Sequence, residues 1–401
     1  MGMPEAIPVI MYHSVGPEKD GFRWNHLITP LDVFEAQMEA LAERGWKTIT
    51  LRQLYDHISK GTSVPERSVV LTFDDGYLDN WVFAYPILKK YGHHAVVWMS
   101  TDFVNPEGTV HPTLEDVWSG KLPMEGLENR GYLSWEEMKL MVRDGVFEIQ
   151  SHAKTHTWYF SSPRIVDFHR PNGVDGYMVP IWLVWNRFPE RKYKSMEEDL
   201  SDKIPYGTPI YEHGKALAVK RYFEDEGLTR ALVGYVHANG GSDFFHSPGW
   251  RQKLIDVVSR YGTRNDRIES EEEYLERVRH ELAESKRLIE ENLGVKVEFL
   301  CWPGGGRNEK TKKIAVDVGY LATTSHFQDP VRKNVFGQNP EEINRIGPAS
   351  PWFWKGKIFK RTGKRFFINS LESFCGSRVA RFQMRLLKFW YIIRWLFSGR
   401  S

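Results

Sequence analysis

Two short runs of residues combine carboxylates and imidazoles at spacings that suit metal-assisted hydrolysis. Asp74 and Asp75 stand side by side directly after the apolar, β-branched segment 68–73. Adjacent carboxylates cannot both be deprotonated cheaply unless a cation or a hydrogen-bond donor neutralises one of them. His152 and His156 lie four residues apart, so both imidazoles could face one ion. An aspartate with two histidines leaves open positions on a metal, as catalytic sites do.

Each run also has a plainer interpretation. The Asp-Asp-Gly run could be a simple turn, and the two histidines could be unrelated polar residues. Both runs, however, follow segments that read as buried strands, and so do His13 and the Trp302-Pro-Gly-Gly-Gly306 run. In barrels and open parallel sheets, functional groups gather at the carboxyl ends of strands.

The elements that must position these residues alternate between strand-like and helix-like patterns. Predicted strands cover residues 7–12, 68–73, 95–99, 147–150, 297–301 and 320–324. Capping boxes predict helix starts at Thr50, Ser134 and Ser270, and Thr29 is predicted to cap a helix that has Pro30 at its first position. A helix over residues 79–91, kinked at Pro86, is also expected. This alternation predicts a parallel sheet, either a barrel or doubly wound.

The alternation of predicted strands and helices stops between residues 160 and 267. We interpret this segment as an insertion folded over one end of the main domain. Its aromatic residues could stack on sugar rings, or they could build a small core of the insertion itself, which is the favoured interpretation. They are Trp182, Trp185, Tyr206, Tyr211 and Trp250.

The motifs resemble those of a known family. Thr72-Phe-Asp-Asp-Gly-Tyr77 and Ser151-His-x3-His156 are similar to the first two motifs of the polysaccharide deacetylases, the NodB-homology or carbohydrate esterase 4 group. Val9-Ile-Met-Tyr-His-Ser14 and Leu300-Cys-Trp-Pro-Gly-Gly305 resemble its branch of poly-N-acetylglucosamine deacetylases. The resemblance implies a distorted (β/α) barrel of the NodB type over residues 1–350, including the insertion at about 160–267. Residues 351–401 would form a basic, aromatic C-terminal helical tail.

The resemblance also implies a role for each motif residue. A divalent metal, most commonly Zn²⁺ with Ni²⁺, Co²⁺ or Fe²⁺ as alternatives, would be held by Asp75, His152 and His156. Asp74 would act as the general base and His13 as the acid, with His326 as the alternative acid. The residues expected to bind substrate or the oxyanion are Tyr77, Trp302, Pro303, Gly304 and Gly305.

One position departs from the family pattern. Cys301 stands where the third motif usually has an arginine that orients the base, and packing is the expected role of this cysteine.

Composition narrows the class of protein further. The 401 residues are 41% hydrophobic, which excludes a mainly disordered chain, and two cysteines exclude a disulfide scaffold or a Cys-rich zinc module. No apolar run is long enough to cross a bilayer and the first residues lack a secretory signal, so a cytoplasmic protein is expected.

Charge is concentrated at one end of the chain. Residues 351–401 contain 12 Lys and Arg but one acidic residue, Glu372. The segment 378–397 mixes cations with aromatic and aliphatic residues, which favours a helix lying on an anionic membrane surface over a nucleic-acid partner. A helix packed on the barrel is nearly as well supported.

The sequence therefore predicts a metal-dependent deacetylase that acts on an N-acetylated amino sugar in a glycan or a lipid-linked glycan precursor, at the inner face of the membrane. The alternatives are a deformylase or O-deacetylase acting on a lipid-linked sugar, and a non-catalytic member that binds a glycan or a membrane.

Overall fold

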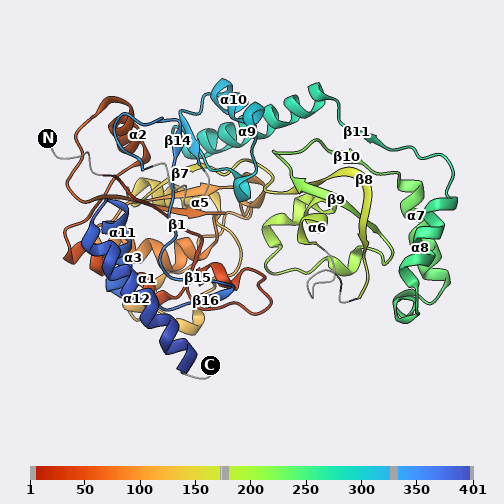
Figure 1. Cartoon of the computed structure of the whole chain (residues 1–401). Coiled ribbons are helices and arrows are strands. Elements are labelled where there is room, and N and C mark those ends of the chain that lie inside the picture. Colours follow the sequence, from red (N-terminus) through yellow and green to blue (C-terminus); the bar gives the residue numbers. More distant parts are fainter. Residues whose placement is uncertain (1–5, 172, 174–179, 326–332, 398–401) are drawn as a thin grey trace. The chain divides into compact units, whose positions relative to one another are not determined.

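The computed structural model describes residues 6–171, 173, 180–325 and 333–397. His326, the alternative acid, lies outside these ranges. The described chain forms two compact units (Figure 1). The first comprises Met1–Ala153, Ser285–Gly305 and Gly319–Ser401, and the second comprises Lys154–Glu284 and Gly306–Val318.

A parallel barrel forms the centre of the first unit. Its seven strands pair in the order β1, β5, β6, β7, β12, β13 and β14, and β4 (Lys47–Thr48) pairs with β5 outside this path. Their bounds are Val9–Tyr12, Ser68–Asp74, Ala95–Met99, Phe147–Ser151, Phe299–Leu300, Ala322–Thr324 and Glu342–Ile343. Beyond β14, the backbone of Ile346 donates to Val9 and accepts from Met11, which closes the ring onto β1. The expected distorted (β/α) barrel is confirmed.

The side chains of alternate strand residues fill the barrel. Val70, Val96, Phe299 and Ile343 belong to one buried cluster, which is completed by residues of α2 (Leu51–Lys60). Side chains in a strand repeat with a period of two, so the same face further along β5 carries Thr72 and then Asp74. The hydrophobic pattern that fills the interior therefore also directs Asp74 to the carboxyl end of the barrel.

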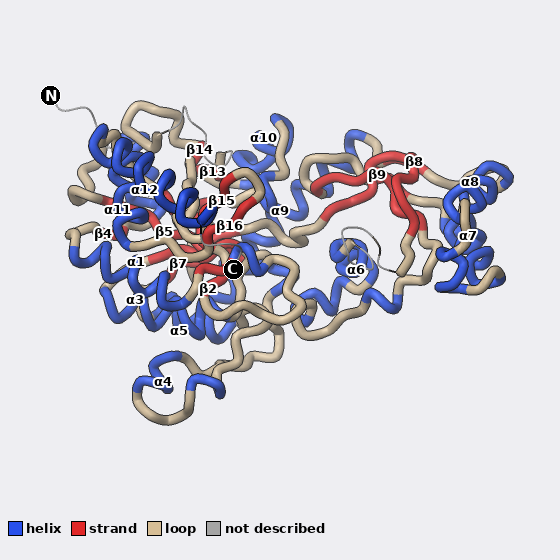
Figure 2. The backbone as a smooth tube through the Cα atoms, turned by 60° about the horizontal axis from the view of Figure 1, so that its bottom comes forward, coloured by secondary structure: helices blue, strands red, loops and turns tan. Residues whose placement is uncertain are grey.

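Helices surround these strands (Figure 2). They are α1 (Leu31–Glu43), α2, α3 (Tyr85–Tyr91) and α5 (Trp135–Arg143), and α9 (Glu271–Leu293) ends in this unit. The short helix α4 (Leu114–Trp118) lies on a loop that stands away from the strands in Figure 2. The capping boxes at Thr50 and Ser134 are confirmed, each with both reciprocal hydrogen bonds.

Two helix predictions need correction. Thr29 is not an N-cap, because it pairs in β3 (Ile28–Thr29) and its hydroxyl donates to the carbonyl of Ser350, while Pro30 takes the N-cap position. The expected helix over 79–91 consists of a π-helical turn, Asn80–Ala84, followed by α3. Pro86 has no N–H, so the backbone register shifts immediately before it.

The basic tail folds onto the first unit. The hairpin of β15 (Trp352–Trp354) and β16 (Lys357–Phe359) leads to α11 (Lys364–Phe374) and α12 (Arg378–Phe397), and α11 packs against α1 and α12. Within the described ranges, every helix is too short or too charged to cross a membrane.

The second unit is a smaller α+β assembly. The long strand β8 (Trp158–Phe168) pairs antiparallel with β9 (Pro209–Lys215), and β10 (Tyr222–Phe223) pairs with β11 (Arg267–Ile268). Its helices are α6 (Ile181–Arg187), α7 (Glu226–Ala238), α8 (Trp250–Arg260) and α10 (Glu309–Val318), together with the first part of α9, residues 271–284. Trp182, Trp185 and Tyr211 are buried, which confirms that aromatic residues of the insertion build its own core.

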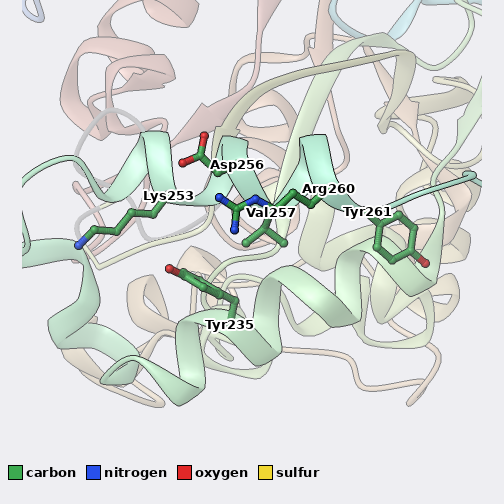
Figure 3. A pocket seen from close by; sticks show the side chains of 6 residues that line it. All are labelled: Tyr235, Lys253, Asp256, Val257, Arg260 and Tyr261. Carbon is green, nitrogen blue, oxygen red and sulfur yellow. The ribbon is translucent and has the colours of Figure 1, made fainter.

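A hollow between α7 and α8 of this unit is shown in Figure 3. Its lining includes Tyr235, Lys253, Arg260 and Tyr261. The phenol of Tyr261 donates to Asp225, the N-cap of α7, so this ring has a structural role. The residues singled out from the sequence for their chemistry all lie elsewhere.

Candidate active site

The carboxyl ends of the barrel strands bring the sequence-predicted residues of the first unit together. His13 follows β1, Asp74 ends β5, and His152 follows β7. Cys301 and Trp302 follow β12, and the strands run parallel throughout. Parallel strands end at the same rim, which is why residues from distant parts of the sequence meet there.

Asp74 is the most constrained residue of this rim. Its carboxylate is buried and accepts two hydrogen bonds from Arg345, from Nη1 to Oδ1 at 2.6 Å and from Nη2 to Oδ2 at 3.0 Å. Such a fork fixes both the position and the plane of a carboxylate. The Sγ of Cys301 donates to Oδ2 at 3.7 Å, and Nε2 of His13 lies 3.9 Å from the same oxygen.

These neighbours decide the charge of Asp74. Burial by itself raises the pKa of the carboxyl group, but the positive charge of Arg345, with smaller contributions from His13 and His152, outweighs burial and lowers the pKa below its ordinary value. Asp74 is therefore a carboxylate at neutral pH although it is buried, and it can accept a proton.

Arg345 is the functional residue that sequence reasoning missed. It lies two residues after β14 and 271 residues from Asp74 along the chain. Its guanidinium holds Asp74, the expected base, while Cys301 occupies the motif position at which an arginine was expected. The strand before it, β14, has only two residues, so the sequence shows no alternating pattern there. Without a predicted strand, nothing in the sequence indicated that Arg345 lies at the rim of the barrel.

His152 is held with one ring nitrogen directed at Asp75. Nδ1–H donates to the carbonyl of Cys301 at 2.8 Å, and Nε2 lies 3.3 Å from Oδ1 of Asp75. A backbone carbonyl on one ring nitrogen fixes the tautomer and leaves the other nitrogen available as a ligand. This donor set of one imidazole Nε2 and one carboxylate fits a divalent cation such as zinc.

The protonation of His152 bears on metal binding. Burial lowers the pKa of its imidazole, but the neighbouring Cys301 and Asp75 side chains together raise the pKa well above the ordinary value. A cation bound at Nε2 must displace that proton, so its affinity will fall as the pH decreases.

His156 belongs to the second unit, which begins at Lys154. Its place in the ligand set rests on its spacing from His152 and stays a prediction. The backbone offers one further observation, since Asp75, Ala153 and His156 have φ of 75°, 58° and 41°. Positive φ is uncommon outside glycine, and such strain concentrates at functional sites.

The remaining predicted residues lie around the rim. The ring of Tyr77 is buried and stacks on Tyr132 with ring centroids 5.4 Å apart. Trp302 is buried, and its indole N–H has no hydrogen-bond partner among the described residues. Pro303–Gly305 form a 3₁₀ turn in which Gly304 has a φ of 53° and the N–H of Gly305 donates to the carbonyl of Trp302.

Gly76 completes the turn that carries both aspartates. It has a φ of +73°, and an added Cβ would overlap Sδ of Met99 and lie 2.9 Å from its Cε. Gly92 has a similar φ of +69° but open space around it. We expect Gly76→Ala to destabilise the protein by about 2–5 kcal/mol, because overpacking adds to backbone strain. Gly92→Ala, the control, is expected to cost about 1–2 kcal/mol through strain alone.

Urea unfolding of both glycine variants measures this difference. Equal losses of unfolding free energy would show that Met99 moves aside freely and that the turn is not held by packing.

Fold and site together define a class of protein: a parallel barrel that holds a buried carboxylate and a histidine–aspartate pair at its carboxyl rim. Comparisons with known proteins identify the family. The family model for polysaccharide deacetylase matches residues 61–197 and 258–323, just over half of the chain. The chain belongs to the polysaccharide deacetylase family.

Individual relatives agree. YxkH of Bacillus subtilis, named for the same family, is 32% identical over 153 residues, which cover 38% of this chain and 44% of YxkH. The poly-beta-1,6-N-acetyl-D-glucosamine N-deacetylase of Escherichia coli is 28% identical over 149 residues, or 37% of this chain and 20% of that protein. The chain thus spans less than half the length of these curated relatives.

Solved structures share the fold. A de-N-acetylase from Aggregatibacter actinomycetemcomitans superposes with a TM-score of 0.50 at 19% identity, covering 85% of this chain and 94% of that one. The BpsB deacetylase domain from Bordetella bronchiseptica has a TM-score of 0.50 at 20% identity, covering 86% and 97%.

Proposed function

We propose that the protein hydrolyses the acetamide of an N-acetylated amino sugar in a glycan, free or lipid-linked, with the help of a divalent metal. The observation that carries this proposal is the pairing of Asp74 with Arg345, which keeps a buried carboxylate charged beside the Asp75–His152 pair. The substrate class is suggested by the E. coli relative, whose name specifies a polymer of N-acetylglucosamine.

Asp75, His152 and His156 are the residues that would hold the metal, and zinc suits one carboxylate with two imidazoles. When bound, the metal would polarise the amide carbonyl and lower the pKa of a water molecule. Every other part of the mechanism falls to side chains and backbone groups of the chain itself.

Asp74 is the proposed general base. Arg345 fixes the carboxylate so that one oxygen can accept the proton of the attacking water, and it holds the pKa low enough for the carboxylate to be charged before the reaction starts. The Oδ2 oxygen faces His13, whose Nε2 is 3.9 Å away. His13 is the proposed acid, which gives a proton to the departing amine.

The glycine turn after β12 completes the proposal. A backbone N–H at Gly304 would donate to the oxygen that becomes negative as water attacks the carbonyl. Trp302, which follows β12, and Tyr77 are the proposed substrate contacts near the same rim.

A chelation experiment tests the reaction. Purified protein is treated with EDTA, dialysed and assayed on N-acetylglucosamine oligomers for released acetate and new free amine, before and after zinc is added. We expect activity to be lost with EDTA and restored by zinc. The activity of His152→Ala should be at least about 100-fold lower than that of the parent. Even residues that only hydrogen-bond to metal ligands contribute about 10–100-fold to metal affinity or activity.

Other outcomes would overturn this proposal. Formate, or acetate released without new amine, would identify a deformylase or an O-deacetylase. Sugar binding without any turnover in the presence of zinc would identify a binding protein. Full activity of His152→Ala would exclude the proposed metal site.

A further inference from the structure

The helix α12 has an apolar stripe that the described chain leaves uncovered. Val379, Phe382, Leu386, Phe389 and Leu396 follow one another at spacings of three, four, three and seven residues, so they share one face of the helix. Their exposed fractions range from 53% to 67%. An apolar face of this length is costly to leave in water.

The opposite side of α12 already has its packing partners. Ala380 and Met384 are buried, and the ring of Tyr391 contacts Phe366 of α11 at a centroid distance of 5.6 Å. The backbone N–H of Gly363 donates to the Tyr391 hydroxyl at 2.8 Å. The helix, which lies beside α11 in Figure 1, is therefore anchored on the first unit by one side. The apolar stripe lies on the other side and does not contribute to the core of that unit.

Cations flank this stripe. Arg378, Arg381, Arg385 and Lys388 repeat at the same spacing of three, four and three residues, and all are exposed. Arg394 adds a fifth cation, and α12 contains no acidic residue. The helix thus offers an apolar row beside a row of positive charge.

The β15–β16 hairpin extends the same surface. Phe353 and Ile358 are paired in register and are 50% and 40% exposed. Lys355 and Lys357 are exposed on either side of Gly356 at the tip. The Nζ of Lys357 lies 5.0 Å from the ring centroid of Trp395 in α12, so the hairpin and the helix are neighbours.

We propose that α12 and the β15–β16 hairpin dock the protein on the surface of an anionic lipid bilayer, with α12 parallel to the membrane. The apolar stripe would enter the boundary between headgroups and acyl chains, as amphipathic helices do. The adjacent cations would face the acidic headgroups, and each contributes about fivefold in affinity near such a surface.

The charge of α12 favours an anionic bilayer over a second copy of the chain as the partner of the apolar stripe. The stripe spacing resembles that of a coiled coil, but two copies of α12 would bring ten cations together without an acidic partner. Nucleic acid would satisfy the cations and leave the Phe and Leu side chains in water. An anionic bilayer would both bury the apolar stripe and pair with the cations. This inference does not depend on the hydrolytic activity.

Vesicle sedimentation with the full chain tests the proposal. We compare vesicles of phosphatidylcholine with vesicles that contain one third phosphatidylserine, at low and high salt. Binding should require phosphatidylserine and weaken as salt increases. Arg381→Gln/Arg385→Gln/Lys388→Gln should bind about 100-fold more weakly. Phe382→Ser/Leu386→Ser/Phe389→Ser should also lose binding.

The matched control replaces exposed apolar residues elsewhere, Val110→Ser with Met124→Ser, which are 47% and 44% exposed, and should bind like the parent. Near-ultraviolet circular dichroism checks that each variant folds. Three results would overturn the proposal: binding that persists in the stripe variant, binding that ignores phosphatidylserine, or a lipid-free dimer in sedimentation velocity that the stripe variant loses.

Discussion

Replacing Asp74 with asparagine is expected to reduce kcat/KM for deacetylation by about 10²–10⁴-fold, the usual contribution of a general base. The amide has nearly the same shape as the carboxylate but cannot take a proton from water. Because Asp75, His152 and His156 are the proposed ligands, the bound metal should be unchanged. Acetate release and metal content by mass spectrometry measure the two quantities.

The matched control for this variant is Asp56→Asn. Asp56 pairs with Lys60 on the surface of α2, with Nζ 2.8 Å from Oδ1, so the same chemical change there should leave activity within about twofold. An Asp74→Asn protein with normal turnover would remove Asp74 from the mechanism. A variant that also loses its metal would instead place Asp74 in the ligand set.

Replacing Arg345 with methionine is expected to have the largest effect on stability. It leaves the buried carboxylate of Asp74 without its guanidinium, and breaking a buried ion pair by removing one partner costs about 3–5 kcal/mol. Removing both charges in Asp74→Asn/Arg345→Met should restore part of this loss, because no unpaired charge is then buried. Urea unfolding of the parent and three variants completes the cycle; additive losses would contradict a direct pairing.

The same variant should change the pH dependence of the reaction. Arg345 is the main group that lowers the pKa of Asp74 against the effect of burial, so without it the pKa rises. Asp74 must be ionised to act as a base, hence the acidic limb of kcat/KM should move to higher pH. In the parent, the lowered pKa stabilises the fold above the unfolded-state pKa of about 3.9, and this contribution is lost as the pH falls through the folded-state value.

The pH profile separates an electrostatic role from a purely structural one. Arg345→Lys retains a positive charge but cannot make the two parallel hydrogen bonds to Asp74. The acidic limb of kcat/KM should therefore return most of the way to its position in the parent, while kcat stays low. If the acidic limb of Arg345→Met coincides with that of the parent, Arg345 serves packing alone.

Local features of this protein were predictable because their causes lie within a few residues. The capping boxes at Thr50, Ser134 and Ser270 each need only two side chains and two backbone N–H groups that lie three residues apart, and all three form. The prediction that Thr29 is an N-cap was wrong, because its hydroxyl donates to the carbonyl of Ser350, 321 residues away. A capping preference is a small local energy that a distant partner can override.

The chain by itself determined the family, the barrel and the presence of Asp74, Asp75, His13 and His152 at strand ends, since buried strands and short motifs are written in consecutive residues. Only the tertiary structure decided that Arg345 takes over the place left by Cys301 beside Asp74, and that one face of α12 packs while another is exposed. Both depend on where distant segments meet. The separation of two residues along the sequence does not show whether they will be in contact. Arg345 reaches Asp74 only because the barrel closes next to it, where Ile346 pairs with β1.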